Sequence, residues 1–348
     1  MIDIAIIGCG GEAHEHAQIL KSIPDCRVSA LMSPTAASRE KLKSEFFPDA
    51  REYDDYEELL ASPPANLSAV LLLTPHNLHY PQAKAAVENG LHVLTEKPMV
   101  TSSQHALELF HAVRNSGKQL GITFQAPYSA TFQHLKTLRE EPHHWGRPEI
   151  IQGWLAQGWM ADTLLTWRQD PTLSGGGQMY DSGSHVLNAM LWLMNEEVLE
   201  VTCLIDNHST PVDINGVAVM RFASGALGSV AIGGNSPGWD TRISLQTDIM
   251  QIHTDPHGKC LKILNNDEIA ARPLPSDTTP AAFTPHRNFI NALLGREPLQ
   301  CGLRDGMRLS LLMDAMYQSA RKGERVTPQT VPPEVEETND EPVENTQF

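Results

Sequence analysis

The sequence predicts an α/β fold in two parts: an N-terminal doubly wound parallel sheet and a C-terminal α+β domain with a large, mostly antiparallel open sheet. Up to residue 124, apolar runs that suit buried strands alternate with helical segments, as in a parallel sheet covered by helices. Later strand-like segments follow one another with turn residues between them, as in an antiparallel sheet. We expect domains at residues 1–124 and 125–327, followed by a tail at 328–348.

The first strand and the turn after it carry the strongest local signal. Residues 4–7 are an apolar run that suits a strand buried on both faces, and residues 8–13 (GCGGEA) match the G-x-G-x-x-G/A dinucleotide fingerprint of a Rossmann domain. Gly8 permits the tight turn, Gly10 lets the backbone approach a pyrophosphate, and Ala13 lets the following helix pack closely. The start of that helix attracts phosphate. The predicted nucleotide site contains Gly8, Gly10, Gly11 and Ala13; an ordinary strand-turn-helix corner is the alternative.

The rest of the first half continues the alternation. Strands are expected at residues 27–32, 68–73, 91–95 and 119–124. Helices are expected at residues 36–47, 56–61, 81–88 and 102–115. Pro81 suits a first helical turn, and Gly117 suits a position just past a helix end. In such a sheet, ligands bind beyond the carboxyl ends of the strands.

The residue that follows the second strand bears on the choice of cofactor. Ser33 lies 20 positions after Ala13, where an NAD site usually has an acidic residue for the ribose hydroxyls. Serine removes the charge that would repel a 2′-phosphate, and Arg39 could reach such a phosphate or could be a solvated helix residue. The sequence therefore leaves both NAD and NADP open.

Two polar segments follow the next strands of the predicted sheet. Residues 74–79 (TPHNLH) follow the third strand, and Glu96-Lys97-Pro98 follow the fourth. A lysine at this edge can donate hydrogen bonds to ligand hydroxyls and stabilise an alkoxide as it forms. A surface lysine beside a turn proline is the alternative interpretation of Lys97.

The second half is expected to form the antiparallel sheet. Strands are expected at residues 149–156, 198–206, 216–222, 226–232, 242–253 and 260–264, and helical pattern covers 288–326. Turn signals lie at Ser224-Gly225 and Pro256-His257-Gly258. One sheet face should be covered by a helix, and the other is a candidate subunit interface.

The predicted covering helix, at about residues 178–194, carries a candidate acid/base pair. Asp181 and His185 are four residues apart, so on a helix the carboxylate would orient the imidazole, which suits proton exchange near neutrality. A simple i,i+4 pair at a helix start is the alternative. The preceding Gly175-Gly176-Gly177 favours the functional interpretation, because three glycines indicate a close backbone approach.

Taken together, these segments resemble the Gfo/Idh/MocA oxidoreductases, which include glucose–fructose oxidoreductase and inositol dehydrogenase. The matching motifs are Gly8-x-Gly10-x-x-Ala13, Thr74-Pro75-x-x-x-His79, Gly90-x-His92-Val93 and Glu96-Lys97-Pro98, and the resemblance extends to about residue 326. It implies that Lys97 is a catalytic or cofactor-contacting residue that works with Asp181 and His185. Two positions depart from the family pattern and affect the expected substrate contacts: Asn188 stands where many members have aspartate, and Pro127 where members often have arginine.

The resemblance and the motifs together give the predicted site. The cofactor set is Gly8, Gly10, Gly11, Ala13, Ser33, Thr74, Pro75, His79, Glu96 and Lys97. The substrate set is Lys97, Tyr128, Arg168, Tyr180, Asp181 and His185. The histidines show no metal-ligand pattern, so no metal is expected.

The expected function is NAD(P)-dependent hydride transfer at a secondary alcohol or ketone of a sugar, polyol or cyclitol. In this hypothesis His185 exchanges the hydroxyl proton, Asp181 orients it and Lys97 polarises the oxygen. A related NAD-dependent glycoside hydrolase is an alternative. A nucleotide-binding regulatory protein without turnover is another, and the intact set of Lys97, Asp181 and His185 argues against it.

Composition limits the partners and the location. With 26 basic and 42 acidic residues, the net charge of −16 argues against nucleic acid and anionic membranes as partners. The five scattered cysteines, the absence of a long apolar run and an N-terminus without a leader pattern favour the cytoplasm. The acidic, proline-rich tail is expected to be disordered. We expect a homodimer or homotetramer formed through the second sheet.

Overall fold

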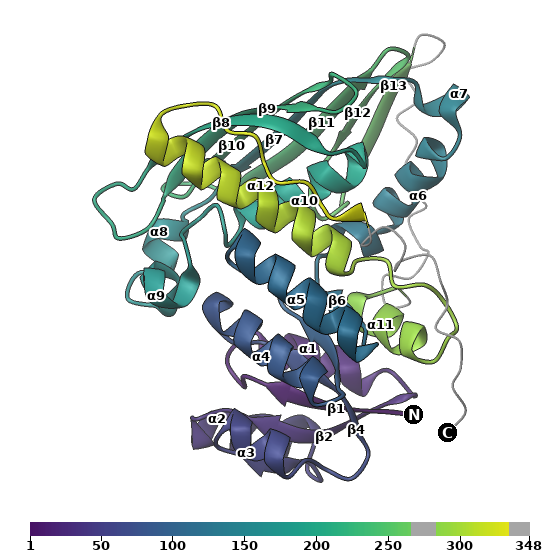
Figure 1. The fold of residues 1–348 in the computed structure, drawn as a ribbon, viewed down its shortest axis with the longest axis vertical. Helices are drawn as coiled ribbons and strands as arrows, with labels where there is room; N and C mark the ends of the chain where they lie inside the picture. The colour runs from purple at the N-terminus through teal and green to yellow at the C-terminus, as the bar shows by residue number, and fades with distance from the viewer. Residues whose placement is uncertain (266–282, 334–348) are drawn as a thin grey trace.

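The computed structural model describes residues 1–265 and 283–333, which form two sheets with helices between and around them (Figure 1). Most of the predicted tail, residues 334–348, lies outside the described residues. Within the described part, no helix is both long and apolar enough to cross a membrane.

The first half forms a six-stranded parallel sheet, which confirms the predicted α/β class. Its strand order is β3-β2-β1-β4-β5-β6. The strands are Ile2–Ile7 (β1), Cys26–Met32 (β2), Arg51–Tyr53 (β3), Leu67–Leu72 (β4), His92–Thr95 (β5) and Leu120–Ile122 (β6). The helices are Ala13–Lys21 (α1), Ala36–Phe46 (α2), Tyr56–Ala61 (α3), His76–Glu88 (α4) and Ser103–Ser116 (α5).

Alternate residues of β1 point to opposite faces of this sheet, and both faces are buried. Ile4 and Ile6 belong to the core that includes residues of α1 and α2, whereas Ala5 and Ile7 belong to the core that includes residues of α4 and α5. Because both faces are covered, every residue from Ile4 to Ile7 is apolar and fully buried. The carboxyl end of β1 is thereby fixed beside those of β2 and β4, where a ligand can bind.

Two details of the first half differ from the prediction. The short strand β3 was not predicted, because three residues carry too little pattern to be recognised. Helix α4 begins at His76, so Pro81 lies inside the helix and not in its first turn. The early start is stabilised by a tertiary contact, since His76 Nδ1 lies 3.1 Å from the carbonyl oxygen of Ser174, 98 residues away.

The described residues of the second half form a seven-stranded sheet, and within it only β7 and β10 pair in parallel. The strand order is β13-β12-β11-β7-β10-β9-β8. The strands are Pro148–Ala156 (β7), Val198–Asp206 (β8), Asn215–Phe222 (β9), Leu227–Gly233 (β10), Asp240–Thr247 (β11), Met250–Thr254 (β12) and Leu261–Asn265 (β13).

The prediction of a single strand at residues 242–253 is wrong, because this segment forms a hairpin of β11 and β12. The turn contains neither glycine nor proline. It is closed by the hydroxyl of Thr247, which accepts hydrogen bonds from the backbone N–H groups of Ile249 and Met250 at 3.3 and 3.1 Å. A turn stabilised by a side-chain hydroxyl leaves a weaker sequence signal than a glycine turn.

Helices α10 and α12 lie on one face of the second sheet (Figure 1). Helix α10 corresponds to the predicted covering helix, and α12 is a second helix on the same face. At Gly153 of β7 an added Cβ would lie 2.5 Å from Met190 Sδ of α10, so the glycine allows the helix to cross the strand closely. The helical segments of this half are Ala126–Tyr128 (η1), Ala130–Arg139 (α6), Pro142–Trp145 (α7), Trp159–Asp162 (α8), Trp167–Gln169 (η2), Pro171–Ser174 (α9), Gly183–Met194 (α10), Pro285–Leu293 (α11) and Leu303–Lys322 (α12).

One C-terminal segment returns to the first sheet. Phe289 of α11 is fully buried in the same core as Ile4 and Ile6. The carbonyl oxygen of Cys301 accepts a hydrogen bond from the backbone N–H of Ile122, the last residue of β6, at 3.1 Å. The predicted division at residue 124 therefore does not separate all spatial neighbours, because residues 285–302 pack on the first half.

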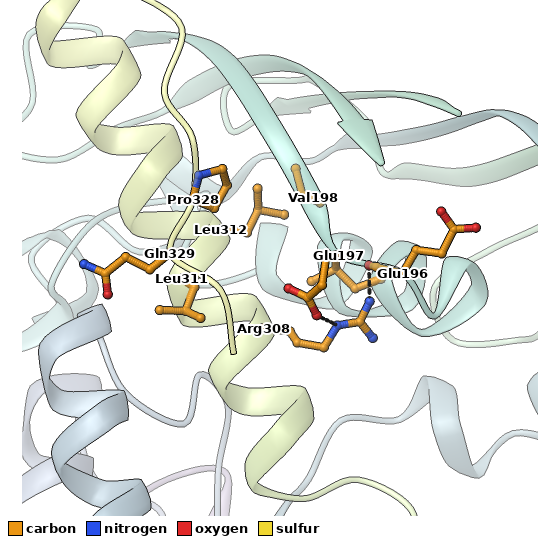
Figure 2. Close-up of a pocket in the computed structure, with 9 residues that line it drawn as sticks. Glu196, Glu197, Val198, Arg308, Leu311, Leu312, Pro328 and Gln329 are labelled. Carbon is orange, nitrogen blue, oxygen red and sulfur yellow. Dashed lines mark hydrogen bonds and ion pairs between the residues drawn. The ribbon is translucent and has the colours of Figure 1, made fainter. Parts of the chain in front are cut away.

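A small hollow lies between α12 and the start of β8 (Figure 2). The buried guanidinium of Arg308 lies beside it, donating to the backbone carbonyl of Glu196 and lying 3.5 Å from a carboxylate oxygen of Glu197. The volume is about 10 Å³, which is room for about one water molecule. This hollow is too small for a substrate or a dinucleotide.

Candidate active site

The turn after β1 has the geometry that a dinucleotide needs. Gly8 has a φ of +99°, and a Cβ there would lie 2.8 Å from the carbonyl oxygen of Leu73, so only glycine fits. A Cβ at Gly10 or Gly11 would meet nothing within 4 Å. Among the described residues, the backbone N–H groups of Gly10 and Gly11 have no intramolecular acceptor. This open space with free donors at the start of α1 fits a pyrophosphate.

The carboxyl end of β2 presents Ser33 with Arg39 beside it. Arg39 is only 7% exposed, so its interpretation as a solvated residue is wrong. Its guanidinium donates to the Ser33 carbonyl, pairs with Asp54 and lies 3.7 Å from Glu52. Asp54 and Glu52 therefore already neutralise the positive charge of Arg39 that would otherwise attract a 2′-phosphate.

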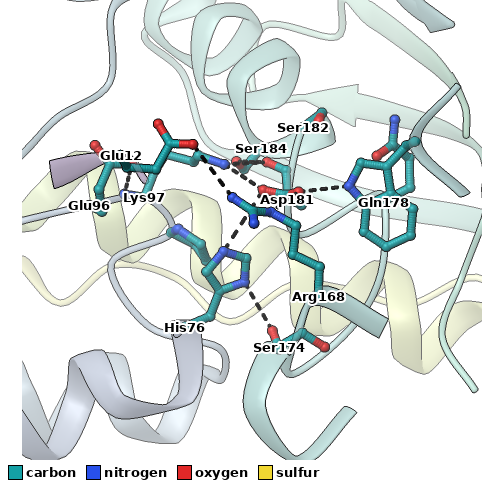
Figure 3. Close-up of polar contacts among 12 residues, drawn as sticks. Glu12, His76, Glu96, Lys97, Arg168, Ser174, Gln178, Asp181, Ser182 and Ser184 are labelled. Carbon is teal, nitrogen blue, oxygen red and sulfur yellow. Dashed lines mark hydrogen bonds and ion pairs between the residues drawn. The ribbon is translucent and has the colours of Figure 1, made fainter. Parts of the chain in front are cut away.

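The central contact of the site joins residues 84 positions apart. The Nζ atom of Lys97, just after β5, lies 2.7 Å from Oδ1 of Asp181 and 3.2 Å from the Asp181 carbonyl oxygen (Figure 3). Both side chains are largely buried. The first half thus contributes the ammonium and the second half the carboxylate.

Other side chains surround the Asp181 carboxylate (Figure 3). Trp159 Nε1 donates to Oδ2 at 2.7 Å, Arg168 Nε donates to the same oxygen at 3.0 Å, and His76 Nε2 lies 3.9 Å from Oδ1. Burial raises the pKa of Asp181, but the charges of Lys97, His76 and Arg168 outweigh it and hold this pKa below its ordinary value. Asp181 is therefore ionised at neutral pH.

His185 is not oriented by Asp181, contrary to the prediction. Helix α10 begins at Gly183, so Asp181 lies in the turn before it and its carboxylate points to Lys97. In the described part of the chain, nothing hydrogen-bonds the ring nitrogens of His185. Burial, followed by the charge of Lys97, lowers the pKa of His185 to about 3. The imidazole is neutral at pH 7 and free to accept a proton.

A second buried carboxylate supports the backbone next to Lys97. Glu96 accepts hydrogen bonds from the Thr123 hydroxyl and, at 3.2 Å, from the backbone N–H of Lys97. His16 of α1 lies 3.3 Å from the same carboxylate, and its other ring nitrogen lies 2.7 Å from His286 Nε2. Burial raises the pKa of Glu96, but His16, Lys97 and Thr123 together lower it below its ordinary value. Glu96 thus connects the helix after the cofactor turn to Lys97.

The segment after β4 has a supporting role in the structure. His79 is fully buried, with its ring nitrogens each 2.8 Å from a backbone carbonyl oxygen, those of Pro98 and Thr74. The Thr74 hydroxyl donates to Gln82 at 2.6 Å, and Pro75 precedes the first residue of α4. His79 therefore joins the two loops, and the structure gives no support to a direct cofactor contact by this side chain.

The predicted substrate residues divide into two groups. Lys97, Arg168, Asp181 and His185 lie in one region, whereas Tyr128 and Tyr180 are buried elsewhere. The Tyr128 hydroxyl lies 3.4 Å from Asn288, and the Tyr180 hydroxyl donates to the Thr101 carbonyl at 2.9 Å. The geometry does not support substrate contacts by these two tyrosines.

The three glycines do make a close backbone approach, but to the protein itself. A Cβ at Gly177 would lie 2.0 Å from the carbonyl oxygen of Asp213. The Asp213 carboxylate accepts hydrogen bonds from the N–H groups of Gly177 and Met179 at 2.6 and 2.8 Å. This docking fixes the turn that carries Asp181.

Sequence reasoning missed two partners of Asp181. Trp159 is 22 residues away and reaches the carboxylate only through the tertiary fold, so no local signal marks it. His76 lies within the polar segment 74–79, and its place directly after Thr74-Pro75 at a strand end is a usable signal. No group of metal-ligating side chains occurs within the described ranges.

Comparison with known proteins identifies the family. Residues 2–124 match the family described as "Oxidoreductase family, NAD-binding Rossmann fold", and residues 132–249 match the "GFO/IDH/MocA C-terminal domain". The chain belongs to the Gfo/Idh/MocA oxidoreductase family. Its first half is accordingly an NAD-binding Rossmann domain, and the turn at Gly8–Gly10–Gly11 is the part that fits the cofactor.

Several curated proteins with similar sequences are named as sugar or cyclitol enzymes, and others are named only as uncharacterized oxidoreductases. Levoglucosan dehydrogenase of Pseudarthrobacter phenanthrenivorans is 24% identical over 70% of this chain and 70% of its own length. The scyllo-inositol 2-dehydrogenase (NADP(+)) of Bacillus subtilis is 27% identical over 55% of this chain and 51% of its own. A 1,5-anhydro-D-fructose reductase of Ensifer adhaerens is 30% identical over 49% of this chain and 51% of its own length. The matches thus span about half to 70% of these relatives.

Solved structures of other dehydrogenases share this fold. The WlbA dehydrogenase from Bordetella pertussis, in complex with NADH and UDP-GlcNAcA, has a TM-score of 0.81 at 23% identity and covers 95% of this chain and 99% of its own. Levoglucosan dehydrogenase in complex with NADH has a TM-score of 0.83 at 19% identity, and the match covers 95% of this chain and 100% of that chain. At these identities the likeness establishes the architecture.

Proposed function

We propose that this protein is an NAD(P)-dependent oxidoreductase that acts on a secondary alcohol or ketone of a sugar, polyol or cyclitol. The observation that carries the proposal is the 2.7 Å contact between Lys97 and Asp181 near a neutral His185, whose ring nitrogens have no hydrogen-bond partner among the described residues. The nicotinamide, when bound, supplies the hydride acceptor or donor. The names of the relatives, which include levoglucosan and scyllo-inositol dehydrogenases, support the substrate class.

Each residue then has a separate role. Lys97 donates a hydrogen bond to the reacting oxygen and stabilises negative charge as it develops there. The neutral imidazole of His185 accepts the hydroxyl proton during oxidation and returns it during reduction. Asp181 stays ionised, compensates the charge of Lys97 and Arg168, and holds Lys97 in place through two hydrogen bonds. Asp181 is thus a partner of the lysine and not of the histidine.

A spectrophotometric screen tests this function. Purified protein is incubated with NAD⁺ or NADP⁺ and a panel of inositols, levoglucosan, free sugars and open-chain polyols, and absorbance at 340 nm is followed. We expect cofactor reduction with at least one member of the panel, and its loss in a Lys97→Met variant that still binds cofactor. Release of free sugar from glycosides without net cofactor reduction would instead indicate the hydrolase alternative. Cofactor binding without turnover of any substrate would indicate a regulatory protein.

We also propose that the chain assembles as a homodimer or homotetramer through the outer face of the second sheet. Leu204, Val217, Ala231 and Trp154 form one cross-strand row on that face, and Leu204 is 72% exposed. A groove of about 400 Å³ lies on the same sheet. An apolar surface of this kind favours association. Sedimentation equilibrium should show an oligomer that Leu204→Glu weakens; a monomeric wild-type protein would contradict the proposal.

A cytoplasmic location is proposed as well. The structure describes all five cysteines, and each is a free thiol, which is consistent with a reducing compartment. Fractionation of the producing cells, with detection of the protein in the soluble cytoplasmic fraction, tests this location.

A further inference from the structure

Aromatic rings extend from His185 to the surface. The ring centroid of His185 lies 5.9 Å from that of Phe124, with the two rings edge to face, and 5.5 Å from that of His257. His257 lies 6.3 Å from the indole of Trp239, and the two planes differ by 23°. Trp239 is 59% exposed, which is unusual for the largest aromatic side chain. The rings thus form a continuous wall beside the histidine proposed for proton transfer.

The loop that carries His257 is rigidly built. The Asp255 carboxylate accepts hydrogen bonds from the backbone N–H groups of His257 and Cys260 at 2.8 and 3.0 Å. The Thr131 hydroxyl donates to the Gly258 carbonyl at 2.7 Å. Gly258 has a φ of +68°, and a Cβ there would lie 2.1 Å from Ser129 Oγ, so the turn requires glycine. His257 is therefore held in position before any ligand arrives.

The hydrogen bond that His257 makes fixes its free nitrogen as an acceptor. Its Nδ1 lies 2.5 Å from the amide oxygen of Gln125, so Nδ1 carries the proton and donates. Nε2 of the neutral ring is then an acceptor, and it has no partner among residues 1–265 and 283–333. A ligand hydroxyl that reaches this wall can donate a hydrogen bond to Nε2.

The geometry points to a subsite for a cyclic sugar or cyclitol, in which Trp239 contacts the C–H face of the ring and His257 Nε2 accepts one of its hydroxyls. The inference rests on the proposed function and narrows its substrate class to cyclic ligands. A ring presents a flat C–H face with hydroxyls around its edge, which matches a flat indole beside a hydrogen-bond acceptor. An open-chain polyol has no such fixed face and gains less from the indole.

Calorimetric binding to the full-length protein with oxidised cofactor bound tests the subsite. The probes are levoglucosan and scyllo-inositol as cyclic ligands and glucitol as an open-chain polyol. In Trp239→Ala we expect affinity for a cyclic probe to fall roughly 2- to 12-fold, with recovery in Trp239→Phe and little change for glucitol. His257→Phe, which keeps a ring but removes the acceptor, should also weaken the cyclic probe. Ile249→Ala, at an exposed apolar side chain of the β11–β12 turn, is the control and should bind normally.

The possible outcomes separate this inference from the proposed function. Turnover of a cyclic substrate with the same kcat/KM in Trp239→Ala and wild type would overturn the subsite and leave the oxidoreductase standing. Binding of a cyclic probe that depends on Trp239 but is never followed by turnover would support the subsite and overturn the oxidoreductase. Equal losses for cyclic probes and glucitol, or wild-type protein that binds no cyclic probe, would also overturn the subsite.

Discussion

The cofactor side and the catalytic side of this site are built in opposite ways. At the cofactor turn, within the part of the chain that the structure describes, Gly10 and Gly11 leave open space and free backbone donors, and no side chain is required. At the catalytic side, side chains are packed around the Asp181 carboxylate, with Lys97 at 2.7 Å and Arg168 at 3.0 Å. The difference indicates that added bulk should destroy the first side, whereas removed charge should destroy the second.

The largest effect is expected from bulk at the cofactor turn. Gly10→Val should abolish dinucleotide binding while the protein still folds, because its Cβ meets no protein atom within 4 Å but would occupy the approach to the pyrophosphate. Calorimetry with NAD⁺ and NADP⁺, together with a thermal melt, checks both parts. Gly238→Val, at another glycine whose Cβ position is open, is the control. Normal binding of both cofactors by Gly10→Val would place the pyrophosphate elsewhere.

The next largest effect is expected from removing the proton-transfer residue, which should impair catalysis without impairing cofactor binding. His185→Ala should lower kcat roughly 100- to 10,000-fold through loss of acid/base catalysis, with nearly unchanged cofactor affinity. His208→Ala, at an exposed histidine, is the control. Because the pKa of His185 is lowered to about 3, the base is present at neutral pH and is lost only as pH falls toward that value. Steady-state kinetics against pH measures both effects.

The lysine offers a further test of the shared site. If Lys97 and His185 act on one oxygen, the Lys97→Ala/His185→Ala double variant should lose much less than the product of the two single losses. Multiplicative losses in kcat would show that the two residues act independently, and full activity in His185→Ala would assign proton transfer to another group.

A smaller loss is expected when the central charge is removed without changing its shape. Asp181→Asn should lower kcat roughly 10- to 100-fold, because Lys97 and Arg168 lose the anion that holds them. Asp240→Asn, which removes an exposed partner of Arg242, is the control and should be nearly neutral. Kinetics and a thermal melt distinguish lost catalysis from lost folding. Wild-type kcat in Asp181→Asn would show that Lys97 needs no anionic partner.

The smallest effect concerns the ribose end of the cofactor side. Ser33→Asp should shift the affinity ratio roughly tenfold toward NAD, because a carboxylate repels a 2′-phosphate and accepts ribose hydroxyls. Arg39, which already contacts Asp54 and the Ser33 carbonyl, limits the size of the shift. Titration of wild type and variant with both cofactors measures it. An unchanged ratio would mean that residue 33 does not face the ribose.

The same contrast explains what the sequence could predict. The cofactor turn follows from contiguous residues, since the strand, Gly8 and the helix start are all local features, and the structure has them as predicted. Lys97 was placed correctly at a strand end for the same reason. The alternation of the first half and the antiparallel sheet of the second also follow from local patterns.

The predictions that failed concern contacts between distant residues, or single hydrogen-bonding groups that leave no mark in the residue pattern. Asp181 and His185 have helical spacing, yet α10 begins between them, so the carboxylate turns to Lys97 instead. Trp159 reaches Asp181 only because α8 is folded against it. The β11–β12 turn depends on one hydroxyl, that of Thr247. The residue pattern does not show this turn, and it therefore predicts one continuous strand at residues 242–253.

The return of α11 to the first sheet limits how the protein can be taken apart. Phe289 fills the core beside Ile4, and a Cβ at Gly121 would already lie 3.1 Å from its ring. A fragment that ended at residue 124 would expose this apolar surface to water and leave the Ile122 N–H without the Cys301 acceptor. A transplant of the nucleotide-binding half into another enzyme would therefore need residues 285–302 as a second insert, which makes this half a discontinuous module.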